Sequence, residues 1–219
     1  MLLDVQGIKV AVLSYTGEVR GNSSKLTAQQ QEYAVNMIDE AAILDQILRV
    51  KERGAEVVIV CLHWGELFTR DPSDSMRAMA ENILLAGADV ILGSHTQQVQ
   101  PVTDKMVSVG GSEKRGIVAY CLGNFLSQDR DPYNDSGMIL SLDITKDLTT
   151  GEVTVAAPSY LPTWIDQYDA QTGKAYQILP MADYQSQKGS LSENAWMRIK
   201  AAYSEVTGKV GDSVALLEK

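Results

Sequence analysis

Two histidines, the full complement of this chain, stand at the ends of apolar runs that are typical of buried strands. His63 follows VVIVCL and His95 follows ADVILGS. In an open parallel α/β sheet, ligands bind beyond the carboxyl ends of the strands, so both imidazoles are expected at one rim. Neutral imidazole is a common metal ligand, and metal sites gather groups from different strands. The alternative is two unrelated histidines, each hydrogen-bonded near a strand end.

Asn124 ends a third apolar run, in the segment GIVAYCLGNF. The preceding Gly123 permits a backbone geometry that other residues resist. The amide of Asn124 can offer its oxygen to a metal, or its NH₂ group to a phosphate or carboxylate oxygen. An ordinary turn with an Asx-type hydrogen bond is the alternative for this position.

Other polar and aromatic residues near these runs allow both a functional and a structural interpretation. Trp64 could stack on a substrate or pack at the rim, and Glu66 could act as a general base or form an exposed salt bridge. A set of aspartates could form an acidic ligand patch, although the calcium-loop pattern is incomplete and a solvated loop is favoured. These aspartates are Asp71, Asp74, Asp129, Asp131 and Asp135.

The first hundred residues predict the elements that would position the two histidines. Strands are expected at residues 7–16, 55–65 and 88–95, because each run is short, apolar and rich in Val and Ile. Residues 18–30 are polar and are expected to form a loop. Helices are expected from Ala34 to Arg53 and from the Pro72–Asp74 start signal to Gly87. The resulting β-α-β-α-β order implies a parallel sheet with right-handed crossovers.

After residue 100 the pattern changes to short strand-like runs that are separated by Gly, Asp, Lys and Pro. This pattern predicts mostly antiparallel strands, with a hairpin turn around Thr149–Gly151. Residues 190–217 are expected to form one or two terminal helices. The predicted organisation is therefore one mixed α/β domain over residues 1–189, followed by a helical segment over residues 190–219.

Composition excludes several classes of protein. The formal net charge is −9 and no Lys/Arg cluster is present, which argues against nucleic-acid binding and against docking on anionic lipid. No signal-like leader or run of about 20 apolar residues is visible, so membrane association would need segments absent from this chain. Cys61 and Cys121 lie in apolar runs and are expected as buried thiols, although a disulfide between neighbouring strands stays open.

Three segments together resemble successive motifs of the CapA family of poly-γ-glutamate capsule biosynthesis proteins. They are LHWGEL at 62–67, AGADVILGSHTQQVQPV at 86–102 and IVAYCLGNFL at 117–126. GIKVAVLSYT and the later YLPTWI resemble flanking strands of the same family, so the likeness covers roughly residues 5–185. The order and the gaps match as well, which makes the resemblance more specific than any one motif.

The resemblance implies part of a four-layer αββα metallophosphatase-like sandwich with divalent metal at the rim. His63, His95 and Asn124 would be the metal-binding and catalytic residues, with Trp64, Gly65, Gln97 and Gly123 lining the substrate site. Gln97 stands where the family has a second histidine. The family's upstream Asp, Asn and His motifs do not precede GIKVAVLSYT, so the chain is expected to be the C-terminal part of the domain.

The implied function is biosynthesis of poly-γ-glutamate, a polyanionic polymer, or of a related envelope precursor, at the cell envelope or extracellular face of a bacterium. One alternative is a metal-dependent phosphoesterase-like hydrolase that an N-terminal half completes. The other is a non-catalytic binding or scaffold module whose histidines have no chemical role. A half-domain would also leave sheet surface uncovered, which predicts a homo-oligomer or a missing partner segment.

Overall fold

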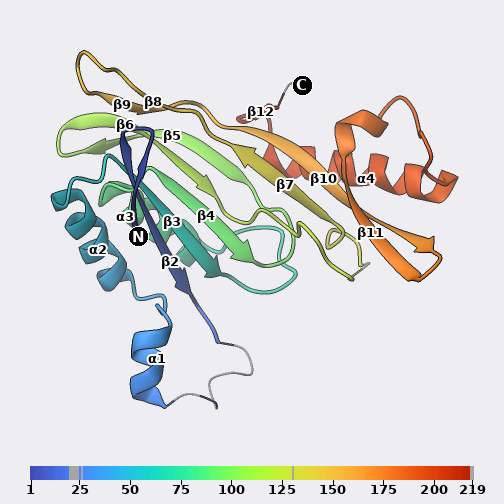
Figure 1. Cartoon of the computed structure of the whole chain (residues 1–219), viewed down its shortest axis with the longest axis horizontal. Coiled ribbons are helices and arrows are strands. Elements are labelled where there is room, and N and C mark those ends of the chain that lie inside the picture. Colours follow the sequence, from blue (N-terminus) through green and yellow to red (C-terminus); the bar gives the residue numbers. More distant parts are fainter. Residues whose placement is uncertain (20–24, 26, 130, 218–219) are drawn as a thin grey trace.

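The predicted strands assemble into two sheets in a computed structural model that describes residues 1–19, 25, 27–129 and 131–217. The first sheet has six strands in the spatial order β1-β2-β3-β4-β6-β5 (Figure 1). Their bounds are β1 Leu2–Val5, β2 Ile8–Thr16, β3 Val57–Trp64, β4 Val90–His95, β5 Val102–Val109 and β6 Ser112–Ala119. Strands β2, β3 and β4 run parallel, so the predicted parallel β-α-β-α-β segment is confirmed.

Two helices connect the parallel strands, and each begins at a capping side chain. In α2 (Glu40–Glu52) the carboxylate of Asp39 accepts the backbone N–H of Ala42. In α3 (Asp74–Leu85) the hydroxyl of Ser73 accepts the N–H of Met76, as the Pro72–Asp74 start signal predicts. These caps satisfy backbone donors that have no partner within the helix.

The prediction of one helix from Ala34 to Arg53 is wrong at its start. Residues 36–38 pair with the end of β2 instead, because Thr16 donates its N–H to Asn36 O and accepts the N–H of Ile38. A separate short helix, α1 (Ala28–Ala34), precedes this pairing and begins within the last residues of the region expected to be a loop. Residues 20–24 and 26 of that expected loop lie outside the described residues.

Both helices cover one face of the first sheet. Val58, Val60 and Leu62 of β3 alternate with residues on the opposite face and are at most 1% exposed. They form one hydrophobic core with Ile43 of α2, Ile83 of α3 and other apolar side chains. Burying each such side chain contributes about 1.5–3 kcal/mol, so this core holds the parallel strands in register.

The second sheet is built around the long strand β10 (Ser159–Ala170), as predicted mostly antiparallel. Strands β7 (Ser136–Ser141) and β11 (Gly173–Pro180) pair with it antiparallel, and β12 (Ala215–Leu216) pairs with it parallel. A separate hairpin of β8 (Ile144–Lys146) and β9 (Val153–Val155) confirms the predicted turn around Thr149–Gly151. Two of the later strands pair parallel within this mostly antiparallel pattern, β6 with β4 and β12 with β10.

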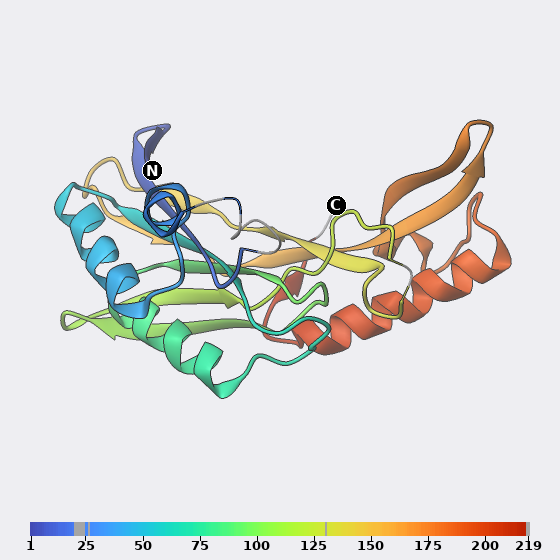
Figure 2. The same cartoon turned by 90° about the horizontal axis from the view of Figure 1, so that it is seen from below.

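The terminal segment forms one long helix, α4 (Glu193–Val210), after a short 3-10 helix at Met181–Tyr184. The expectation of helix throughout residues 190–217 is wrong near the end, because Ala215–Leu216 extends the second sheet as β12. Figure 2 shows α4 and the first sheet on the same side of the second sheet. Ile199 of α4, Ile117 of β6 and Trp164 of β10 share a second hydrophobic core that joins these three parts.

The mixed α/β class is therefore confirmed, with a parallel sheet and a mostly antiparallel one. The described residues form a helix layer, a first sheet and a second sheet, with α4 beside the first sheet (Figure 2). Cys61 and Cys121 are both free thiols, so the disulfide alternative is wrong. Burial raises the pKa of the Cys61 thiol, which disfavours the thiolate.

Candidate functional site

The carboxyl ends of β2, β3 and β4 meet at one edge of the first sheet, called the rim below. Thr16, the last residue of β2, lies directly opposite His63 of β3. On the next strand His95, the last residue of β4, lies opposite Trp64. The rim is therefore formed by parallel neighbours whose strand ends are aligned, as expected for ligand sites of parallel sheets.

The ring of His63 is held by its neighbours on both sides. Its Nδ1 lies 3.1 Å from the hydroxyl oxygen of Thr16. Its ring centroid lies 4.3 Å from that of His95, with the ring planes tilted by 52°. The two imidazoles therefore contact each other, which separate histidines at unrelated strand ends would not do.

His95 reaches this contact because its backbone departs from the regular strand. In strict alternation, His95 would face the same side as Trp64, which packs in the first core, and not the side of His63. The φ angle of His95 is 103°, in a region that L-residues rarely adopt. This strained turn re-aims the imidazole, and such strain persists where surrounding structure enforces it, often at functional sites.

Close backbone packing places Asn124 at the same rim. Gly123 has a φ of 73°, and a Cβ there would lie 2.6 Å from Ser136 O. The backbone N–H of Asn124 donates to Ser136 O at 2.9 Å, and its side-chain NH₂ donates to Asn134 O at 2.9 Å. The amide oxygen of Asn124 is therefore oriented by bonds to the segment that leads into β7.

Two adjoining cavities open at the rim, and together they are lined by all seven residues predicted from the sequence. One, of about 520 Å³, is lined by His63, His95, Gln97, Gly123 and Asn124, together with Glu18, Leu67 and Ser94. The other, of about 620 Å³, shares His63, His95 and Glu18 and is also lined by Trp64 and Gly65. The structure thus brings the two imidazoles and the Asn124 amide together at one cavity.

The side chain of Trp64 is buried and hydrogen-bonded, which indicates a structural role at the rim. Its side chain is 4% exposed, and its indole N–H donates to Tyr120 O at 3.0 Å. Gly93 makes this bond possible, because a Cβ at that position would lie 2.6 Å from the indole nitrogen. The burial leaves little of the ring available for stacking on a substrate.

Two residues that the sequence analysis passed over complete the rim. Glu18 lines both cavities, and its carboxylate Oε1 lies 3.5 Å from His95 Nε2. The hydroxyl of Thr16 donates to Glu18 O at 2.8 Å. Glu18 lies two residues after the end of the predicted strand at Thr16. This closeness to a strand end is the signal that could have identified it. Glu66, in contrast, is an exposed residue that lines the larger cavity.

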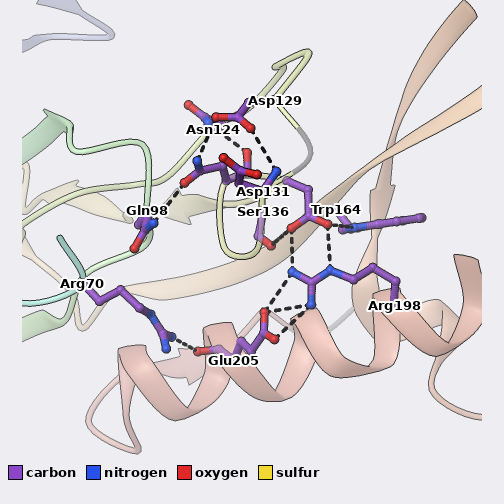
Figure 3. A network of polar contacts seen from close by, with 11 residues as sticks. Arg70, Gln98, Asn124, Asp129, Asp131, Ser136, Trp164, Arg198 and Glu205 are labelled. Atoms are coloured by element: carbon purple, nitrogen blue, oxygen red, sulfur yellow. Dashed lines mark hydrogen bonds and ion pairs between the residues drawn. The ribbon is translucent and has the colours of Figure 1, made fainter. Parts of the chain in front are cut away.

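A buried polar network holds the segment to which the Asn124 side chain is hydrogen-bonded (Figure 3). Asp135 accepts two hydrogen bonds from the Arg198 guanidinium of α4, at 2.7 and 2.8 Å. It also accepts the indole N–H of Trp164 at 2.8 Å. The favoured interpretation of Asp135 as part of a solvated loop is wrong, since this residue is 4% exposed. Its burial is stable because its oxygens are paired with a guanidinium and with N–H donors.

The same network links the site loops to α4. Arg198 also binds Glu205 at 2.9 Å, and Arg70, on the loop after β3, donates to Glu205 O at 2.9 Å. Burial acts to lower the pKa of Arg198, but its hydrogen bonds to Asp135 and Glu205 outweigh this and raise that pKa. The guanidinium therefore remains charged, and α4 anchors both the loop after β3 and the loop before β7.

The rim residues do not by themselves form a metal site. Within the described part of the chain, no group of three His, Cys, Asp or Glu residues is arranged to hold a metal ion. A catalytic zinc site uses three protein ligands. His63, His95 and Glu18 line one cavity but are not arranged as such a group, and Asn124 adds only a weak amide oxygen. The donor set does not fit the group, so a divalent-ion cofactor stays a prediction from the resemblance.

Comparison with known proteins decides the family. The family described as "Bacterial capsule synthesis protein PGA_cap" matches residues 1–129, more than half of the chain. The chain belongs to this PGA_cap family. The matched range contains the rim residues from Thr16 to Asn124, so the expectation of a CapA-type protein is confirmed on the part of the chain that carries the site.

Two characterised relatives of this PGA_cap protein are similar over the same share of the chain. Capsule biosynthesis protein CapA of Bacillus anthracis is 31% identical over 126 residues, which are 56% of this chain and 28% of that protein. PGA biosynthesis protein CapA of Bacillus subtilis (strain 168) is 30% identical over 122 residues, 56% of this chain and 29% of that protein. The aligned part thus covers under a third of each relative's length.

A solved structure of the Haemophilus influenzae NAD nucleotidase NadN is loosely similar to the PGA_cap chain. The alignment covers 93% of this chain and 36% of that one, with 13% sequence identity and a TM-score of 0.43. At this score the likeness supports no transfer of fold details or activity. In the described residues, no helix has the length and apolar character needed to cross a membrane.

Proposed function

We propose that this chain supplies a ligand-binding rim to a CapA-type protein of capsule biosynthesis, which acts on poly-γ-glutamate or a related envelope precursor at the cell envelope. The observation that carries the proposal is the convergence of His63, His95 and Asn124 on one cavity of about 520 Å³. These residues come from the ends of β3 and β4 and from the loop after β6, within the segment matched by the family. An accidental cluster would not require the strained φ of 103° at His95.

The polarity of the cavity is compatible with an extended polar chain. Besides the imidazoles, it is lined by the amides of Gln97 and Asn124 and by the hydroxyl of Ser94, and Glu18 supplies the one carboxylate among the described lining residues. Uncharged donors and acceptors can bind the amide groups of poly-γ-glutamate, and the donors can also bind its free α-carboxylates. The chain's net charge of −9 opposes contact with a polyanion elsewhere, so binding is expected to be confined to the rim.

The hydrolase alternative receives no support from the donor set described above. Hydrolysis by a metal-bound hydroxide requires a metal held by the protein in a defined geometry. That alternative requires ligands from an N-terminal half, so the donors of the described residues do not test it and we derive no hydrolytic step. The role proposed for this chain is binding and positioning of the polymer or its precursor by the groups that line the rim.

Replacement of the rim histidines in the producing bacterium tests the proposal. The full-length protein would carry His63→Gln or His95→Gln, and cell-bound poly-γ-glutamate would be measured at matched protein levels. Loss of one or two ligand hydrogen bonds predicts a decrease in polymer of about fivefold or more. The exposed substitution Glu152→Gln serves as control. Unchanged polymer in both histidine variants would overturn the rim proposal and favour the non-catalytic scaffold.

A further inference from the structure

The hydroxyl of Thr16 stands between the backbone of its own strand end and the ring of His63. It donates its hydrogen to Glu18 O at 2.8 Å. The same oxygen lies 3.1 Å from His63 Nδ1. Thr16 and His63 are direct partners in the parallel register, so both side chains lie on the same face. The hydroxyl is thus fixed by pairing of the strands and by a turn of the backbone.

A threonine hydroxyl has one hydrogen to donate and two lone pairs that accept. The contact with Glu18 O is the shorter of the two, 2.8 Å against 3.1 Å to His63 Nδ1, which favours placing the hydrogen of Thr16 in that bond. With the hydrogen there, the hydroxyl oxygen acts as the acceptor toward His63, and Nδ1 carries the proton. In a neutral imidazole one nitrogen is a donor and the other an acceptor, so Nε2 of His63 retains its lone pair.

We propose that Thr16 is a positioning residue that fixes His63 in the Nδ1–H tautomer, so that the ring offers Nε2 as an acceptor at the rim. Hydrogen bonds of this kind commonly select the tautomer of functional histidines. The backbone supports the arrangement, because Gly17 donates its N–H to His63 O at 2.8 Å. The bond from Thr16 to Glu18 O also shapes the turn that brings the Glu18 carboxylate to 3.5 Å from His95 Nε2.

The proposal restricts which ligand groups neutral His63 can bind. A lone pair on Nε2 accepts a hydrogen bond from an N–H or O–H group, and it cannot donate to a carboxylate. A polyglutamate or its precursor would therefore contact neutral His63 through an amide or amine N–H. This consequence rests on the proposed function, whereas the tautomer itself depends only on Thr16, Glu18 and His63.

Nitrogen NMR measures the tautomer directly. The ¹⁵N-labelled 219-residue chain would be studied by two-bond ¹H–¹⁵N correlation, about two pH units above the ordinary imidazole pKa of about 6.5. The chain has two histidines, so the spectra of His63→Gln and His95→Gln assign each ring by the loss of one set of signals. The expected result is a His63 ring with the proton on Nδ1.

Two substitutions at Thr16 separate positioning from packing. Thr16→Val keeps the shape but removes the acceptor, and the ratio of Nδ1–H to Nε2–H tautomer should decrease by about fivefold, the effect of losing one neutral hydrogen bond. Thr16→Ser keeps the hydroxyl and should retain the wild-type ratio. A wild-type His63 with its proton on Nε2, or an unchanged ratio in a folded Thr16→Val chain, would overturn the proposal. The wild-type spectrum alone decides the matter if Thr16→Val does not fold.

The polymer assay distinguishes failure of this inference from failure of the proposed function. If Thr16→Val changes the tautomer while both histidine variants retain polymer production, the positioning role holds and the rim proposal fails. If the histidine variants lose polymer while the tautomer is unaffected by Thr16→Val, the rim proposal holds and the role of Thr16 is refuted.

Discussion

The two ends of the first sheet carry cavities of similar size with different electrostatic organisation. At the amino ends of β3, β4 and β6, a cavity of about 420 Å³ is lined by charged residues such as Asp89 and Lys114. At the carboxyl ends, the cavity of about 520 Å³ is lined by the imidazoles of His63 and His95 and the amide of Asn124. The same strands therefore end in two chemically distinct surroundings.

Ion pairs occupy the amino end. Lys114 Nζ lies 2.7 Å from Asp89, and Lys146 Nζ lies 2.7 Å from Glu56. The other oxygen of Asp89 accepts the backbone N–H of Val58 at 2.8 Å. The ion pairs at the amino end stabilise the packing of the strands, whereas the imidazoles and amides at the rim can exchange bound water for a ligand.

The comparison indicates that the amino end contributes to stability and that the rim contributes to binding. Four predictions test this difference, and they are ranked by the expected change in the free energy of unfolding.

The largest loss of stability is expected from Asp135→Ala, which affects the support behind the rim and not its lining. The substitution removes the Arg198–Asp135 pair and leaves the Trp164 indole N–H without its acceptor, while Glu205 still pairs with the guanidinium. The expected loss is therefore about 3 kcal/mol, the lower end for breaking a buried pair. Urea unfolding monitored by circular dichroism measures the change. Asp169→Ala, which removes an exposed pair with Lys174, should have almost no effect. Equal effects of the two substitutions would contradict the assignment of Asp135 to a buried network.

A smaller loss, about 2 kcal/mol, is expected from Asp89→Asn at the amino end. Asparagine can still accept the N–H of Val58, but it no longer balances the charge of Lys114. The measurement is again urea unfolding, with the exposed helical pair Asp45–Arg49 disrupted by Asp45→Asn as the control. Polymer production should be unchanged in cells that retain folded Asp89→Asn protein. A loss of polymer at wild-type protein levels would remove the distinction between the two ends.

The ion-paired end also predicts a dependence of stability on pH. Burial lowers the pKa of Lys114 from its ordinary 10.5, although Asp89 opposes the shift. Between the lowered pKa and 10.5 the unfolded chain binds more protons than the folded one, so this contribution to stability rises with pH through that window. Lys114→Met removes the titrating amine, and with it this pH-dependent contribution to the free energy of unfolding. The difference in unfolding free energy between wild type and variant should therefore increase toward pH 10.5, by at most about 1.4 kcal/mol per pH unit. A difference that decreases over this range would show that the shift has the opposite sign.

The smallest change in stability is expected from His63→Gln at the rim. Glutamine keeps a polar group at a half-buried position, so the free energy of unfolding should change by less than about 1 kcal/mol. The same substitution is expected to reduce polymer production strongly, and this contrast sharpens the difference between the two ends. If His63→Gln destabilised the chain as much as Asp89→Asn, the imidazole would be a structural group.

The strands and the position of the rim could be predicted from the sequence because both depend on local patterns. Apolar runs that end in His63 and His95 indicate buried parallel strands, and parallel strand ends meet at one edge. The start of α2 was misplaced because Thr16 pairs with residues 36–38, a contact between distant parts of the chain. Helical periodicity carries no information about such pairing.

The parts of the site that were missed depend on long-range partners or on backbone strain. Asp135 and Arg198 are 63 residues apart in sequence, so a local pattern gave no reason to bury the aspartate. The alternation of β4 does not reveal the φ of 103° that re-aims His95. Glu18 and Thr16 stand at the junction of a strand and a polar stretch, where composition predicts a loop and does not indicate which side chains face the rim.

The network behind Asn124 has a practical consequence for dissecting this protein. The family match ends at residue 129, so a minimal fragment cut there would retain Asn124 but lose its anchors at Asn134 and Ser136. It would also lose the second sheet and α4, which cover one face of the first sheet. A fragment used for ligand-binding experiments should therefore extend through Val210, the end of α4. This helix, which supports the rim, ends about eighty residues beyond the boundary of the family match.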